Sequence, residues 1–345
     1  MNTKRNLIQF CPLAVLLALP MAVQAQVNYA ISGSTASVTS SPNVTDYIVI
    51  DSTYQGYPVT SIEDDAFDSC TGLVGVNIPN SVTSIGISAF LGCTSLSSVV
   101  IGTNVTSIGD FAFSGTGLGV VTIPNSVTSI GEEAFGECFS LAIVTLPNSV
   151  TNIGESAFSE CTSLTIMTLP NSITSIGRFT FNGTSLTSVT IPNGVTSIGQ
   201  SAFAGCVSLT NVAMPGSVTN IAPYVFGFCP ALTGVYFQGN APTPTTNTAV
   251  FSGDTSAVAY YLPGATNWGA TFDGIPAVMR PPPALAISTY SNQPVLFFPA
   301  GVGAGYVVQM TTNLSTGPWV TVTNGVVMTA IMVTNPPGTA FFRLQ

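Results

Sequence analysis

The chain has 345 residues, and its 14 acidic residues against five basic ones give a formal net charge of −9. It contains no histidine, and only 6% of its residues are charged. Such a chain lacks the basic patch that nucleic acid requires, and it is repelled by anionic membrane surfaces. The absence of His removes the commonest general base and metal ligand, so most hydrolase sites are excluded.

The first 25 residues have the pattern of a secretory signal peptide. Lys4 and Arg5 precede an apolar run from Leu13 to Val23, and small residues follow at a suitable cleavage site ending at Ala25. The run is shorter than the ~20 apolar residues of a membrane span. We therefore expect an exported chain, secreted or at the cell surface, without a membrane span. Its three remaining arginines face 14 acidic residues, which is a net charge of −11.

Residues 26–56 predict a small N-terminal β cap. Short alternating segments at 29–31, 36–38 and 47–50 are separated by Gly/Ser and Pro/Asn turns. A repeat array needs such a polar cap over its first core layer.

Residues 57–280 contain a repeat whose clearest mark is a phenylalanine. It recurs in steps of 23, 23, 22, 23, 23, 22 and 23 residues, at Phe67, Phe90, Phe113, Phe135, Phe158, Phe181, Phe203 and Phe226. A fixed period of this length predicts a solenoid, in which each coil buries its apolar face against its neighbours. We expect these phenylalanines to form the structural core.

Each unit reads L-x2-V-x-I-P-x3-V-x2-I-G-x2-A-F-x2-C-x2. This pattern predicts a short strand ended by Pro, a second short extended piece, and a tight turn or single helical turn at A-F. The strands of successive coils would stack in parallel about 4.8 Å apart. We expect the Gly of each unit, such as Gly109 or Gly154, to require a positive φ.

The phrases IPNSVTSIGESAF and GCTSL resemble the BspA-type, or Treponema-type, leucine-rich repeat of secreted and surface proteins. The resemblance covers roughly residues 57–279. It implies a mainly β, right-handed solenoid of 23-residue coils with N- and C-terminal caps, and adhesive or protein-binding roles. It carries over no catalytic residue.

The last part of the chain departs from the repeat. Residues 241–280 predict the C-terminal cap, and Pro281 to Pro283 predict a stiff linker within the final segment 281–345. Strand candidates at 295–298, 306–310, 319–322, 326–333 and 340–344 predict a small β-sandwich-like module.

A cysteine follows the phenylalanine in six of the eight units, which gives a core Cys column: Cys70, Cys93, Cys138, Cys161, Cys206 and Cys229. The units of Phe113 and Phe181 are one residue short, and the gap is expected at the cysteine position. Adjacent cysteines in stacked coils fall within disulfide range, whereas parallel side chains favour buried thiols. Both alternatives remain open.

Two polar columns have structural and functional interpretations. Acids at 63–68, 110, 132–133 and 155 could hold Ca²⁺, but no EF-hand spacing accompanies them, and capping or solvation of the corner is favoured.

Thr recurs at 60, 83, 106, 128, 151, 174, 196 and 219, and beside the strand at 122, 145, 168 and 190. A Thr ladder can order water at an ice face, although β propensity also explains it.

Five aromatic residues break the consensus and are the candidate partner-binding residues. Phe111, Phe179 and Tyr224 stand two positions before the core phenylalanine, and Phe139 and Phe228 lie beside the Cys column. Exposed aromatic residues are preferred anchors of interfaces. Phe111 and Phe179 occur in the two short units, so packing in the space left by the deletion is an equal alternative.

Together these features predict a non-enzymatic extracellular scaffold for recognition or adhesion. It would bind proteins or surface glycans through the repeat surface, without catalytic residues, cofactor or metal. The alternatives are ice or surface binding by the Thr ladders, and a purely structural role in the cell envelope.

Overall fold

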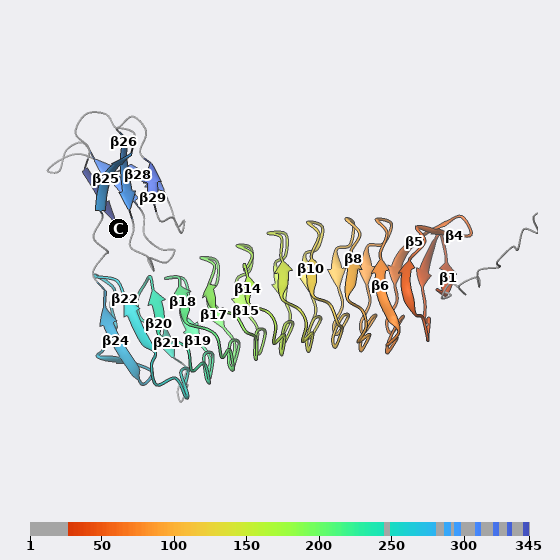
Figure 1. Cartoon of the computed structure of the whole chain (residues 1–345), viewed down its shortest axis with the longest axis horizontal. Coiled ribbons are helices and arrows are strands. Elements are labelled where there is room, and N and C mark those ends of the chain that lie inside the picture. Colours follow the sequence, from red (N-terminus) through yellow and green to blue (C-terminus); the bar gives the residue numbers. More distant parts are fainter. Residues whose placement is uncertain are drawn as a thin grey trace, which may run out of the picture.

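The structure, a computed structural model, describes residues 27–244 and 249–280, together with the backbone of six strands between 286 and 344. The expected signal peptide and the linker at 281–283 lie outside the described residues. Every regular element in the described part of the chain is a β-strand (Figure 1). Accordingly, none of these residues forms a helix capable of crossing a membrane.

The predicted solenoid is confirmed, with the L-x2-V-x-I segment of each repeat forming one strand per coil. We call the surface made by these strands the sheet face. Its strands are β3 (Asp46–Val49), β6 (Leu73–Asn77), β8 (Ser98–Val100), β10 (Val120–Thr122), β12 (Ile143–Thr145), β14 (Ile166–Met167), β16 (Ser188–Thr190), β18 (Asn211–Met214), β20 (Gly234–Phe237), β22 (Val258–Tyr261) and β24 (Ile275–Met279).

The V-x2-I segment forms a second series of shorter strands, which we call the short-strand face. It comprises β5 (Tyr57–Ile62), β7 (Ser84–Ile85), β9 (Ser107–Ile108), β11 (Ser129–Ile130), β13 (Asn152–Ile153), β15 (Ser175–Ile176), β17 (Ser197–Ile198), β19 (Asn220–Ile221) and β21 (Thr243–Pro244). At the A-F position the chain makes turns, and the helical turn considered as an alternative is not formed.

Successive coils pair in parallel and in register along one axis (Figure 1). Val76 lies opposite Val99, for example, and Val121 lies opposite Val144. Because side chains alternate across a strand, the consensus Val and Ile point inward while the residues between them point out. The inward columns make one continuous hydrophobic core from the N-terminal cap to Ile275.

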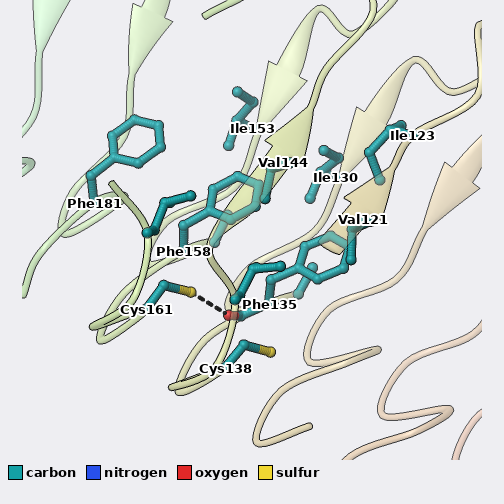
Figure 2. Packing of buried hydrophobic residues seen from close by; sticks show 14 of the residues in the cluster. Val121, Ile123, Ile130, Phe135, Cys138, Val144, Ile153, Phe158, Cys161 and Phe181 are labelled. Atoms are coloured by element: carbon teal, nitrogen blue, oxygen red, sulfur yellow. Dashed lines mark hydrogen bonds between the residues drawn. The ribbon is translucent and has the colours of Figure 1, made fainter. Parts of the chain in front are cut away.

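The core phenylalanines form a single stack along the solenoid. All eight predicted rings are buried, and neighbouring rings lie nearly parallel with centroids 5.0–5.8 Å apart (Figure 2). The stack continues to Phe251, which lies 5.7 Å from Phe226 although the sequence period has loosened there. The repeat architecture therefore extends one coil further than the phenylalanine spacing indicates.

The expectation of a positive φ at the Gly of each repeat unit is wrong. Neither Gly109 nor Gly154 has a positive φ; instead, a Cβ on Gly109 would lie 2.6 Å from the backbone of Gly86 in the preceding coil. Glycine is thus required by close backbone approach. The left-handed conformation occurs two residues later, at positions occupied by residues such as Ser88, Glu133 and Ser156.

The parallel ladder of the sheet face is interrupted twice. No ladder joins β8 to β10 or β14 to β16 anywhere in the described solenoid, which divides the face into the sheets β3-β6-β8, β10-β12-β14 and β16-β18-β20-β22-β24-β23. On the short-strand face the ladder runs unbroken from β5 to β13 and resumes at β15.

Both ends of the array carry additional strands. At the N-terminal end, β1 (Tyr29–Ser32) and β2 (Thr35–Val38) form an antiparallel pair beside β5, and β4 (Thr53–Tyr54) also pairs with β5. At the other end, β23 (Thr271–Phe272) turns back onto β24, and Trp268 stacks on Tyr261.

Beyond residue 285, six strands form two antiparallel three-stranded sheets. One contains β25 (Ala286–Tyr290), β26 (Gln293–Phe297) and β29 (Ala330–Met332), and the other contains β28 (Val320–Thr323), β27 (Val308–Thr311) and β30 (Phe341–Leu344). Strand β25 was not anticipated from the sequence.

Candidate functional site

The cysteine column is buried and contains free thiols. Each Sγ from Cys93 onward donates a hydrogen bond to the carbonyl of a core phenylalanine in the preceding coil, as Cys161 does to Phe135 at 3.1 Å (Figure 2). Burial, followed by the neighbouring Cys70, raises the pKa of Cys93 to about 12. A protonated, buried thiol is a weak nucleophile, so this column is suited to packing rather than to chemistry.

The expected gap in this column does not exist. Thr116 and Thr184 are buried at the cysteine position, and each hydroxyl donates to the carbonyl of the phenylalanine three residues earlier. Thr116 Oγ1 also lies 3.2 Å from Cys138 Sγ. The missing residue falls one step later, because a single residue, Gly117, separates Thr116 from Leu118, the leucine that opens the next coil.

Three of the candidate aromatic residues lie at the left-handed position of the A-F corner. Phe111, Phe179 and Tyr224 have φ values of 58°, 53° and 58°. Phe111 and Phe179 are half-buried, and the guanidinium of Arg178 lies 5.6 Å from the ring centroid of Phe179. Tyr224 is more open, with 40% of its surface exposed.

The other two candidate aromatic residues are exposed near the Cys column. Phe139 is 56% exposed and Phe228 is 62% exposed, but they belong to coils four repeats apart. The five candidates therefore occupy scattered positions along one corner, and the structure does not bring them together into one cluster.

The first Thr column is engaged in bonds between coils. Thr83 Oγ1 donates to the Thr60 carbonyl at 3.0 Å, Thr106 donates to Thr83 at 3.0 Å, and the same bond recurs along the solenoid. Each hydroxyl donates its proton to a backbone carbonyl of the preceding coil, so the Thr column has a structural explanation that requires no ligand.

Two of the corner acids also join neighbouring coils. Asp64 Oδ1 accepts the backbone N–H of Ile87, and Asp110 Oδ1 accepts that of Glu132, each at 2.7 Å. Burial, Glu132 and Glu137 raise the pKa of Glu133. No three acidic or thiol side chains in the described residues gather as a metal site would require.

The repeat geometry agrees with a family comparison. The family model described as a BspA-type leucine-rich-repeat region matches residues 60–165 and 128–257, with six copies. These ranges together cover more than half of the chain. The chain belongs to this family.

Solved structures of bacterial leucine-rich-repeat proteins are similar to this chain at low identity. A leucine-rich-repeat protein from Bacteroides ovatus is 24% identical over 68% of this chain and 83% of its own, with a TM-score of 0.41. The T. pallidum leucine-rich-repeat protein is 25% identical over the same shares, with a TM-score of 0.35. A leucine-rich cell surface protein from Faecalibacterium prausnitzii is 23% identical over 61% and 93%, with a TM-score of 0.30. The search of curated proteins finds no match.

The sheet face of this BspA-type array carries an apolar column that the sequence reasoning missed. Val120, Ile143 and Ile166 lie side by side on adjacent strands with exposed fractions of 56%, 49% and 69%. The equivalent residues in flanking coils are Ser98 and Ser188. The signal was present as aliphatic residues at a position that is small or polar in most other coils, but a strand of alternating Val and Ile hides which of them point outward.

The sheet face is also free of charge over most of its length. From β6 to β22, none of its strands contains an acidic or basic residue. Beside the apolar column runs the exposed second Thr column, in which Thr122 lies opposite Thr145. This face therefore combines a continuous apolar strip with uncharged hydroxyl groups, and it has the character of a contact surface.

Proposed function

We propose that this chain is an exported, non-enzymatic recognition scaffold, built as a right-handed solenoid, that binds a protein partner through the sheet face. The observation that carries the proposal is the exposed column of Val120, Ile143 and Ile166. Single exposed aliphatic residues are ordinary on protein surfaces, whereas adjacent ones on a rigid sheet form a contiguous apolar patch. Removing such a patch from water contributes about 25 cal/mol per Å² of buried apolar surface.

The test compares two sets of substitutions in the full mature chain. Val120→Ser, Ile143→Ser and Ile166→Ser together introduce the residue that the same column carries at Ser98 and Ser188. The matched control replaces Phe139 by Thr and Phe228 by Gly, the residues found at equivalent positions in other coils. Each set removes exposed apolar side chains, so unfolding free energies should change little.

Binding is measured against a panel of soluble matrix proteins and cell-wall glycans. We expect a protein ligand whose binding is lost in the sheet-face variant and kept in the corner variant. The reverse result would assign recognition to the corner aromatic residues. A panel in which neither proteins nor glycans bind would favour a structural envelope role.

Ice binding is the alternative from a different class, and the hydrogen bonds of the first Thr column weigh against it. Its hydroxyl protons are directed at the preceding coil, as between Thr83 and Thr60. Only the second column, such as Thr122 and Thr145, presents hydroxyls on the sheet face. Thermal hysteresis of the purified chain at millimolar concentration would establish the alternative.

A further inference from the structure

Each of the two interruptions of the sheet face coincides with a shortened turn. In a full-length coil two residues separate the column position from the leucine that opens the next coil, such as Thr94 and Ser95 between Cys93 and Leu96. Only Gly117 precedes the coil of β10, and only Ser185 precedes the coil of β16. The shortened connection displaces the start of the strand, and the displaced strand forms no ladder with the strand before it.

A cavity lies at each interruption. The first has a volume of about 700 Å³; it lies between β8 and β10, with Val100, Val120 and Thr122 in its lining, and it extends to Thr145 and Pro147 of the following coil. The second has a volume of about 340 Å³ between β14 and β16, and its lining includes Ile166 and Thr190. Both also reach the proline that ends the strand, at Pro124 and Pro192 respectively. They are corresponding places in two coils 68 residues apart.

We infer that these paired cavities receive the side chains at positions i and i+4 of an extended polypeptide segment that crosses the sheet face along the solenoid axis. The inference rests on the proposed function, because it takes the sheet face to be the recognition surface.

The spacing of the cavities sets the register of this segment. Three coil steps, at ~4.8 Å for paired strands and 5.0–5.8 Å along the phenylalanine stack, place the cavities on the order of 14–17 Å apart, and four residues of extended chain span ~14 Å at ~3.4 Å each. Side chains at i and i+4 of an extended chain point to the same side. The residue at i+2 points the same way and would contact Ile143, which lies midway between the cavities on β12.

The charge distribution selects among such segments. Ten of the 14 carboxylates lie between Glu63 and Glu160, and that stretch contains no Lys or Arg. The two cavities are lined entirely by uncharged residues. Apolar side chains at i and i+4 therefore suit the cavities, while Lys or Arg elsewhere in the segment complements the acidic chain. An acidic segment would be repelled.

The experiment selects a phage-displayed dodecapeptide library on the immobilised full mature chain at low salt. We expect enriched peptides to carry apolar residues four apart, to include Lys or Arg, and to lack Asp and Glu. Enrichment of another spacing, or of nothing, would overturn the inference.

Substitutions that fill the cavities give the decisive control. The outward column that contains Thr122 and Thr190 carries Tyr236 further along, so Thr122→Tyr with Thr190→Tyr uses a residue the column accepts. Asn77→Tyr, in the same outward column but outside both cavities, is the matched control. By fluorescence anisotropy, the double variant should bind the enriched peptide at least tenfold more weakly, and Asn77→Tyr should bind it normally.

Equal affinity in the double variant would overturn the inference. If that variant also kept the panel ligand, while the triple serine variant of the sheet face lost it, the proposed function would stand without the cavities. A second variant that inserts Ser after Gly117 restores the length of the turn. This insertion should close the first cavity and weaken binding of the enriched peptide as the double variant does. Full retention of the peptide's affinity would again contradict the inference.

Discussion

At the scale of single residues, the column that begins with cysteines ends in a buried acid. Asp254 follows Phe251 as Thr116 follows Phe113, and it is only 4% exposed. Its Oδ1 accepts the Cys229 N–H at 2.6 Å, while Oδ2 is buried without a hydrogen-bond partner. Burial raises the pKa of Asp254 to about 6, against the hydrogen bond from Cys229, which lowers it.

The ionisation of Asp254 should make the free energy of unfolding depend on pH. Because the folded-state pKa is raised, the ionised carboxylate disfavours the folded state above pH 6, and this effect disappears as the pH falls toward 4. Asp254→Asn keeps an acceptor for the Cys229 N–H, so at pH 7.5 it should raise the free energy of unfolding by on the order of 1–3 kcal/mol.

Urea unfolding of the wild type and this variant at pH 4 and pH 7.5 measures the effect. The difference between the two proteins should shrink toward zero at pH 4. A difference that stays the same at both values would show that the charge of Asp254 is not responsible.

At the scale of elements, the interrupted ladder leaves specific amides without the bond that their equivalents make. Ile78 N–H donates to the Val100 carbonyl at 2.9 Å, and Ile123 N–H donates to Thr145 at 3.0 Å. Ile101 occupies the same position in its coil, yet within the described sheet face β8 has no partner on that side. The loss of one residue from the turn before β10 therefore leaves one edge of β8 without backbone hydrogen-bond partners in the described sheet face.

Amide hydrogen exchange should detect the interruption in the absence of any ligand. We expect Ile101 to exchange about fivefold faster than Ile123, since a net hydrogen bond contributes about 1 kcal/mol. In the variant with Ser inserted after Gly117, the two rates should become similar. Equal rates in the wild type would show that β8 and β10 are paired in solution.

At the scale of the whole molecule, the charges are segregated. The acids between Glu63 and Glu160 follow the A-F corner, including Asp110 and Glu133, whereas the sheet-face strands from β6 to β18 contain no charged residue. With no cation among them in that stretch, their mutual repulsion opposes folding.

Salt should therefore stabilise this protein. Raising NaCl from 10 to 150 mM shortens the screening length from about 30 Å to about 8 Å, and we expect the free energy of unfolding in urea to rise by on the order of 1 kcal/mol. The double variant Glu132→Gln and Glu133→Gln should gain less from the same change. A stability that falls with salt would mean that attractive pairs dominate.

The sequence sufficed to predict the architecture because the repeat imposes the same apolar positions many times. The phenylalanine stack and the short strands follow from periodicity alone, which one coil would not have established. The role of Gly109 was mistaken, because the clash that requires glycine comes from a coil 23 residues away. For the same reason, Thr116 was not recognised as the substitute for a cysteine.

The candidate site was much less predictable. Aromatic residues that differ from the repeat consensus, such as Phe139, stand out when the coils are aligned. Ile143 looks like a core residue until the position of β12 shows that its side chain points outward. The cavities depend on how a shortened turn displaces the following strand. This displacement depends on how neighbouring coils pack, so it cannot be inferred from the residue types alone.

The Cys and Thr columns also give the array a direction. Cys161 donates to Phe135 and Thr83 donates to Thr60, so in both columns a later coil supplies the donor and an earlier coil the acceptor. A chain that emerges from its N-terminus can satisfy these side chains as soon as the preceding coil is in place. Each new coil then forms against a coil that is already folded, and the protein can assemble progressively while its remainder is still being synthesised.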